Sequence, residues 1–71
     1  MKYKTMCSAP ESYGLEKARE IFRKGLLWAE FNVFETDKPN VYNVGNKTGM
    51  ISGIILEIKK GRISVKREVR S

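Results

Sequence analysis

The stretch KKGRISVKREVR, residues 59–70, decides the fold because it is both strongly basic and regularly alternating. Ile63, Val65 and Val69 stand at odd positions, and charged or hydroxyl side chains separate them. Alternation with a period of two is typical of a β-strand that buries one face. A disordered basic arm has no reason to space branched aliphatic residues in this way. We therefore expect residues 62–69 to form a strand, with these three residues facing inward.

The residues before this strand predict its hairpin partner. Lys60-Gly61 is typical of a tight two-residue turn. The preceding run, MISGIILEI at 50–58, is rich in β-forming residues, and we expect Ile55 and Glu57 to point outward. Gly53 in the middle of this run predicts a bulge or a bend. The inward residues of this strand would be Ile54, Leu56 and Ile58.

A change of period further upstream predicts one helix. Between residues 13 and 24 the apolar side chains recur at helical spacing, and charged residues take the opposite side. Gly25 is a natural residue to follow the helix end. The apolar stripe consists of Leu15, Ala18, Ile21, Phe22 and Leu26.

The remaining runs predict further strands. Residues 2–7 form a short β-type run, and LLWAEFNVFE at 26–35 alternates so that Trp28 and Phe34 would point away from the helix. Turns at 37–40 and 46–49 flank a short strand at 41–45. The order β-α-β-β-β-β predicts an α+β fold in which one helix packs on a small antiparallel sheet of four to five strands. A small SH3-like barrel with an N-terminal helix is the alternative, if the strand bent at Gly53 closes the sheet.

Length and composition limit the possible functions. The 71 residues fit one domain, 1–71, and contain one cysteine and no histidine. We therefore expect no disulfide within the chain, no metal site and no other cofactor. Nucleotide-binding and metalloprotease motifs do not occur, and no serine has a histidine to activate it. We expect a cytoplasmic protein that is not an enzyme and has no membrane-spanning segment.

The position of the positive charge suggests what the domain binds. Residues 59–71 contain six basic residues against Glu68, a net +5 of the +6 carried by the whole chain. If the strand buries its aliphatic residues, the cations gather on its outer face, together with the two outward aromatic residues. Cations for phosphates and flat rings for bases are what single-stranded nucleic acid requires. The predicted nucleic-acid-binding residues are Lys59, Lys60, Arg62, Lys66, Arg70, Trp28 and Phe34.

Three other interpretations stay open. The same residues would serve a protein-binding adaptor or inhibitor that docks on an acidic surface of a larger protein, as small accessory proteins of phages and mobile elements do. A sheet face with exposed aromatic residues could instead be buried in a homodimer. Outward Lys and Arg could also serve only to keep the sheet soluble.

Overall fold

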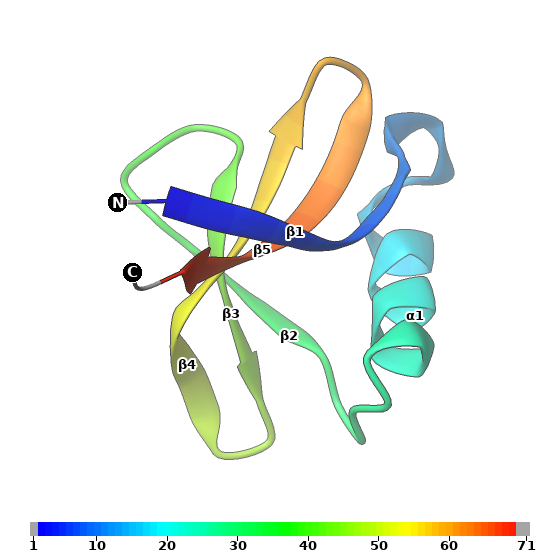
Figure 1. Cartoon of the computed structure of the whole chain (residues 1–71). Coiled ribbons are helices and arrows are strands. Elements are labelled where there is room, and N and C mark those ends of the chain that lie inside the picture. The colour runs from blue at the N-terminus through cyan, green and yellow to red at the C-terminus, as the bar shows by residue number, and fades with distance from the viewer. Residues whose placement is uncertain (1, 70–71) are drawn as a thin grey trace.

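The computed structural model describes residues 2–69 as one helix, one short 3₁₀ helix and five antiparallel strands (Figure 1). This is an α+β fold with a small antiparallel sheet, as the sequence predicts. The strand order is β1-β5-β4-β3-β2, so β1 and β2 are the two edges of an open sheet within the described residues. In chain order the elements are β1 (Lys2–Pro10), η1 (Glu11–Tyr13), α1 (Leu15–Gly25), β2 (Asn32–Glu35), β3 (Val41–Asn46), β4 (Gly49–Lys59) and β5 (Arg62–Val69).

The core lies between α1 and one face of the sheet. Ala18 and Phe22 from the middle of α1 are fully buried, and Phe31 from the α1–β2 connection packs on Phe22 with ring centroids 5.7 Å apart. The sheet contributes the aliphatic side chains Val44, Leu56, Ile63 and Val65, each at most 1% exposed. Burial of each such side chain stabilises the fold by roughly 1.5–3 kcal/mol, so this small cluster accounts for much of the fold's stability.

The predicted orientation of β5 is correct over most of its length. Ile63 and Val65 are buried, but Val69, which we expected to face the core, is 40% exposed. Gly25 at the end of α1 lies against Cys7, which pairs with Val65. Val69 is four residues further along β5, past the part of the sheet that α1 covers, and therefore lacks the cover that the helix gives to Val65.

The predicted strand at 26–35 is wrong in its first half. The chain continues from α1 into a connection, and only Asn32–Glu35 joins the sheet. Leu27 adopts a left-handed backbone conformation with φ 57°. The N–H of Leu27 donates to the Lys24 carbonyl at 3.3 Å, and the N–H of Trp28 donates to the Arg23 carbonyl at 3.0 Å. This pair of bonds is a Schellman motif in which Leu27 takes the position that glycine usually occupies.

The bend predicted at Gly53 is present. Gly53 has φ 83°, and the register of β3 against β4 shifts between Asn43 and Gly45. On β3, Gly45 lies so close to β4 that a Cβ there would overlap the carbonyl of Gly49. The bend gives β4 two segments and turns the β3–β4 hairpin toward the α1–β2 connection, which lies at the same end of the molecule (Figure 1).

Candidate functional site

The face of the sheet that points away from α1, here called the open face, carries several of the predicted binding residues. Residues that pair directly across antiparallel strands share a face. One row crosses all five strands and contains Thr5, Lys66, Ile55, Asn43 and Phe34. The next row contains Ser8, Ser64, Glu57 and Val41, and the row nearest the β4–β5 hairpin contains Pro10, Arg62 and Lys59. The structure thus brings Lys59, Arg62, Lys66 and Phe34 to one face.

Three basic residues gather at the β4–β5 hairpin, and we call Lys59, Lys60 and Arg62 the hairpin cations. Lys60 and Gly61 form the turn with φ of 53° and 75°, values typical of a type I′ hairpin. The N–H of Glu11 donates to the Gly61 carbonyl at 2.9 Å and holds the turn against η1. Within residues 2–69, no carboxylate forms an ion pair with any hairpin cation. Their charges therefore remain available to an anionic ligand.

One hydroxyl group contacts the guanidinium group of Arg62, and a second hydroxyl lies next to the first. Arg62 Nε donates to Ser8 Oγ at 2.9 Å, and Ser64 Oγ lies 3.5 Å from the same oxygen. The hydrogen bond from Arg62 reaches from β5 to the edge strand β1 and limits the directions that its side chain can take. An oriented guanidinium beside two hydroxyl groups is a set of donors suited to phosphate oxygens.

Lys66 does not add to this cationic group. Its Nζ lies 2.7 Å from Glu57 Oε1, and the two side chains are only 28% and 26% exposed. The hydrogen bond from Lys66 is the main cause that lowers the pKa of Glu57; burial opposes it, and the charges of Lys66 and Lys59 add to it. Because Glu57 stays ionised, the pair is neutral. The positive charge on the open face is therefore concentrated at the hairpin rather than spread along β5.

A hollow of about 500 Å³ lies on the open face, and the Lys66–Glu57 pair forms part of its lining. Its walls are Tyr3 of β1 and residues 36–38 of the β2–β3 connection. That connection is held in place by Thr36, whose hydroxyl donates to the Val41 carbonyl at 2.6 Å and accepts from the N–H of Lys38 at 3.1 Å. The hollow is therefore already shaped without a ligand. Its floor consists of Val41, Asn43, Ile55, Glu57 and Lys66.

Trp28 does not lie on the open face, so the prediction that it points away from the helix on the same strand face as Phe34 is wrong. Trp28 belongs to the α1–β2 connection, where its ring stacks on Phe31 with centroids 5.7 Å apart and an interplanar angle of 29°. It also packs against the core cluster. A run with a period of two cannot show that the chain leaves the strand conformation at Leu27, so the parity of Trp28 could not be predicted.

Another basic residue of the C-terminal segment, Arg67, does not lie on the open face. Arg67 pairs with Ile54 of β4 and Lys4 of β1, and all three lie on the same side of the sheet as the core. Arg70, which belongs to the predicted site, lies outside the described residues.

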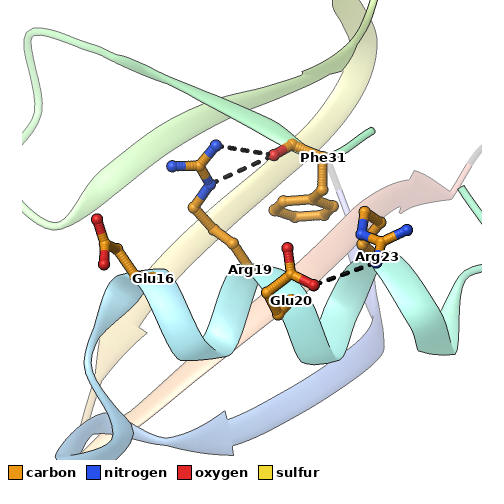
Figure 2. Close-up of a pocket in the computed structure, with 5 residues that line it drawn as sticks. All are labelled: Glu16, Arg19, Glu20, Arg23 and Phe31. Carbon is orange, nitrogen blue, oxygen red and sulfur yellow. Dashed lines mark hydrogen bonds and ion pairs between the residues drawn. The ribbon is translucent and has the colours of Figure 1, made fainter. Parts of the chain in front are cut away.

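A smaller hollow, of about 270 Å³, lies between α1 and the α1–β2 connection, and we call it the Arg19 hollow. Figure 2 shows the four charged side chains of α1 that line this hollow together with Phe31. Two of the four are acidic and two are basic, so their charges cancel and do not attract an ion. The side chains are Glu16, Arg19, Glu20 and Arg23.

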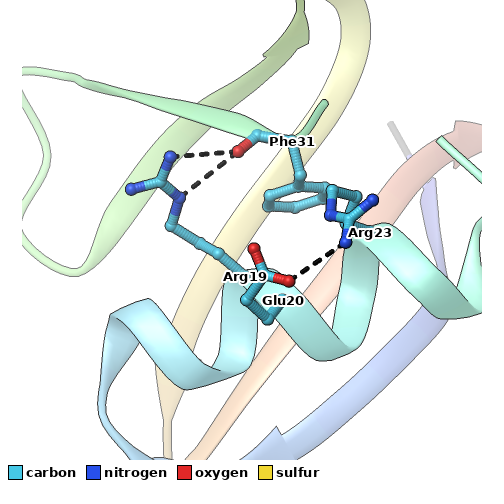
Figure 3. Close-up of polar contacts among 4 residues, drawn as sticks. All are labelled: Arg19, Glu20, Arg23 and Phe31. Atoms are coloured by element: carbon cyan, nitrogen blue, oxygen red, sulfur yellow. Dashed lines mark hydrogen bonds and ion pairs between the residues drawn. The ribbon is translucent and has the colours of Figure 1, made fainter. Parts of the chain in front are cut away.

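The basic groups of the Arg19 hollow are already engaged in the fold. Figure 3 shows that Arg19 donates from Nε and Nη2 to the Phe31 carbonyl, at 3.3 and 3.1 Å, while Arg23 pairs with Glu20 at 3.1 Å. Arg19 thereby fastens the α1–β2 connection to the helix. Nothing in the sequence pointed to this role, because the acceptor is a backbone carbonyl twelve residues away. We regard this hollow as a structural contact rather than a binding site.

Other kinds of site find no support between residues 2 and 69. In that range no three acidic or thiol side chains are grouped so that they could hold a metal ion. Burial raises the pKa of the lone thiol, Cys7, which disfavours its reactive thiolate form. The helices described for the chain are too short or too polar to cross a bilayer. Comparison with known proteins gave no matching protein family, no similar curated protein and no similar solved structure.

Proposed function

We propose that this chain is a small, non-enzymatic domain that binds single-stranded nucleic acid through the open face of its sheet. The hairpin cations would contact phosphates, and the hollow would receive bases against Tyr3 and Ile55. Phe34, in the same row of the open face as Ile55, would offer a further ring beside the hollow. The observation that carries this proposal is the group of three cations with no carboxylate partner in the described chain, next to a preformed hollow on the same face.

The cations and the aromatic ring lie at opposite ends of the open face, which suggests how a nucleic acid strand would be oriented on it. Lys59 and Arg62 are paired neighbours at one end of the face, and the neutral Lys66–Glu57 pair separates them from Phe34 at the other end. A phosphate backbone would be held at the hairpin, and bases would extend toward β3 and β2. Contacts of this type bind many sequences with similar strength, because every base has a flat face and every nucleotide a phosphate.

Salt dependence tests this proposal quantitatively. Three phosphate contacts to a single strand predict a slope of log affinity against log salt of about −2. Affinity for a fluorescein-labelled oligo-dT or mixed-sequence RNA dodecamer should then fall roughly 15- to 20-fold when salt is raised fourfold. Fluorescence anisotropy measures both the affinity and the slope.

A matched pair of triple variants shows which cations are responsible. Replacing Lys59, Lys60 and Arg62 by Gln should abolish most binding and bring the slope close to zero. Replacing Lys17, Lys24 and Lys47 by Gln removes the same charge elsewhere on the molecule and should leave most of the affinity. Absence of binding at low salt, or equal loss in the two triple variants, would contradict the proposal.

A further inference from the structure

Another hollow, away from the open face, is apolar and is flanked by exposed apolar side chains. It has a volume of about 510 Å³ and lies between the α1–β2 connection and the β3–β4 hairpin. We call it the Leu27 hollow. Trp28, Ala29, Ile51 and Ile54 form its apolar lining, and Glu30, Asn46, Lys47 and Thr48 complete its rim with Leu27.

Leu27 has both an exposed side chain and a backbone conformation that is unfavourable for leucine. Its side chain is 91% exposed, and its backbone has φ 57°, where glycine would be favoured. A second large apolar residue, Met50, is 62% exposed and precedes Ile51 in the chain. Neither exposure nor backbone conformation benefits the isolated fold. Both are explained if these side chains contact a partner that covers the hollow.

The wall of the hollow is fixed rather than mobile. The Schellman bonds from Leu27 and Trp28 tie the connection to the end of α1, and Arg19 ties it again at Phe31. Trp28 is held by its stacking on Phe31. A preformed apolar surface of this kind can bind a partner without the entropic cost of ordering itself.

The charges around the Leu27 hollow indicate the chemistry of that partner. The lining itself contains one basic residue, Lys47, and one acidic residue, Glu30. Next to Ile54, on the same side of the sheet, its direct strand partner Arg67 and the following Lys4 add two more cations. An apolar hollow with this excess of positive charge on one side complements an apolar side chain flanked by carboxylates.

The indole of Trp28 adds a polar group to this apolar wall. Its N–H has no hydrogen-bond partner among residues 2–69, yet it is not a buried unsatisfied group, so it reaches solvent. A tryptophan that combines a fixed ring with a free donor is typical of the residues that contribute most to protein interfaces.

We propose that the Leu27 hollow is a docking site for a protein segment in which a large apolar anchor residue is flanked by Asp or Glu. The anchor would fill the space between Trp28, Ile51 and Ile54, and the flanking carboxylates would meet Lys47 and Arg67. This site is independent of the open face. A domain with both sites would join a nucleic acid to an acidic protein partner.

Peptide selection tests this proposal and does not require the natural partner to be identified first. The purified chain is immobilised, and a phage-displayed library of random dodecamer peptides is selected against it. Enriched peptides should share a Leu, Phe or Trp with acidic residues within four positions. Synthetic copies of these peptides should bind in solution, and their binding should weaken at higher salt. No enrichment above a protein-free surface, or enrichment of basic or purely apolar peptides, would overturn the proposal.

Matched variants place the peptides on the molecule. Leu27→Ser should weaken peptide binding at least tenfold, while Ile21→Ser, which alters an exposed apolar residue of α1 outside the hollow, should change it less than twofold. Lys47→Glu with Arg67→Glu should weaken acidic peptides similarly. Equal effects of the two serine variants would refute the assignment of the site, and thermal unfolding of each variant verifies that it is folded.

Two other occupants of the hollow would give distinct results. Sedimentation equilibrium would reveal a dimer that Leu27→Ser dissociates if a second copy filled it, although two copies would bring like-charged rims together. Flotation with phosphatidylserine-containing vesicles, abolished by Leu27→Ser, would indicate a lipid surface; either result would overturn the proposal. The Gln variant of all three hairpin cations should bind peptides normally, and Leu27→Ser should bind oligonucleotides normally, so that failure of one proposal leaves the other testable.

Discussion

Replacing Leu27 by glycine should stabilise this domain although it removes a large apolar side chain. A side chain in the left-handed conformation costs roughly 1–2 kcal/mol, and Leu27 has φ 57°. Glycine removes this cost but makes the unfolded chain more flexible, which returns about 0.4–1 kcal/mol. Since the side chain is 91% exposed, little burial is lost. The expected net gain in the free energy of unfolding is about 0.5–1 kcal/mol, or roughly 3–6 °C in Tm for a chain of this size.

Urea unfolding followed by circular dichroism measures this gain, and Leu27→Ala is the matched control. Alanine removes the same side chain but keeps a Cβ in the left-handed region, so its stability should stay close to that of the parent chain. The m-value should be equal in all three proteins, because they bury the same surface on folding. If Leu27→Gly is no more stable than Leu27→Ala, the backbone at this position is not strained and the argument for a functional Leu27 loses its physical basis.

Three further predictions concern the sheet, the loop and the ion pair. Gly45→Ala should destabilise the fold by more than about 2 kcal/mol in urea unfolding, since its Cβ would overlap the Gly49 carbonyl. Gly25→Ala, whose Cβ would make an ordinary contact with Cys7, should instead be neutral or slightly stabilising. Arg19→Met should lower the free energy of unfolding by about 1–2 kcal/mol, because the Phe31 carbonyl loses two donors while the apolar stem is kept; a loss no larger than that of Lys17→Met would contradict this. The pKa of Glu57 is lowered in the folded state, so the stability it contributes is present above its ordinary pKa and lost as pH falls through the folded value. Glu57→Gln should therefore remove part of the acid-induced loss of stability, and a parallel decline in both proteins would exclude this contribution.

The elements with regular spacing were predictable from the sequence. Ile63 and Val65 of β5, and Ala18 and Phe22 of α1, are buried as their periods of two and 3.6 indicate. Gly53 lies at the bend in β4, because a residue without a side chain can adopt the positive φ that the bend requires. These features depend on local alternation and on backbone conformations that glycine favours, and both can be recognised in the sequence letters.

The connection after α1 could not be predicted, because its conformation contradicts local preference. The sequence gives no indication that Leu27 adopts the left-handed conformation. Gly25, the residue we expected to follow the helix end, is instead an ordinary residue of the helix. The Lys66–Glu57 pair, by contrast, does have a signal in the sequence. A two-residue turn at Lys60-Gly61 sets the register of β4 against β5 and places Glu57 diagonally opposite Lys66. That register restricts the cationic surface to the hairpin.

The pairing of β1 with β5 also determines when the chain can fold during its synthesis. Lys2 pairs with Val69, so β1 has no neighbour in the described sheet until synthesis has passed the end of β5. The eleven-residue helix packs on that same incomplete surface, and isolated helices of this length are marginal in water. The nascent chain should therefore stay open and accessible to chaperones and proteases, and assembly should occur in a single late step.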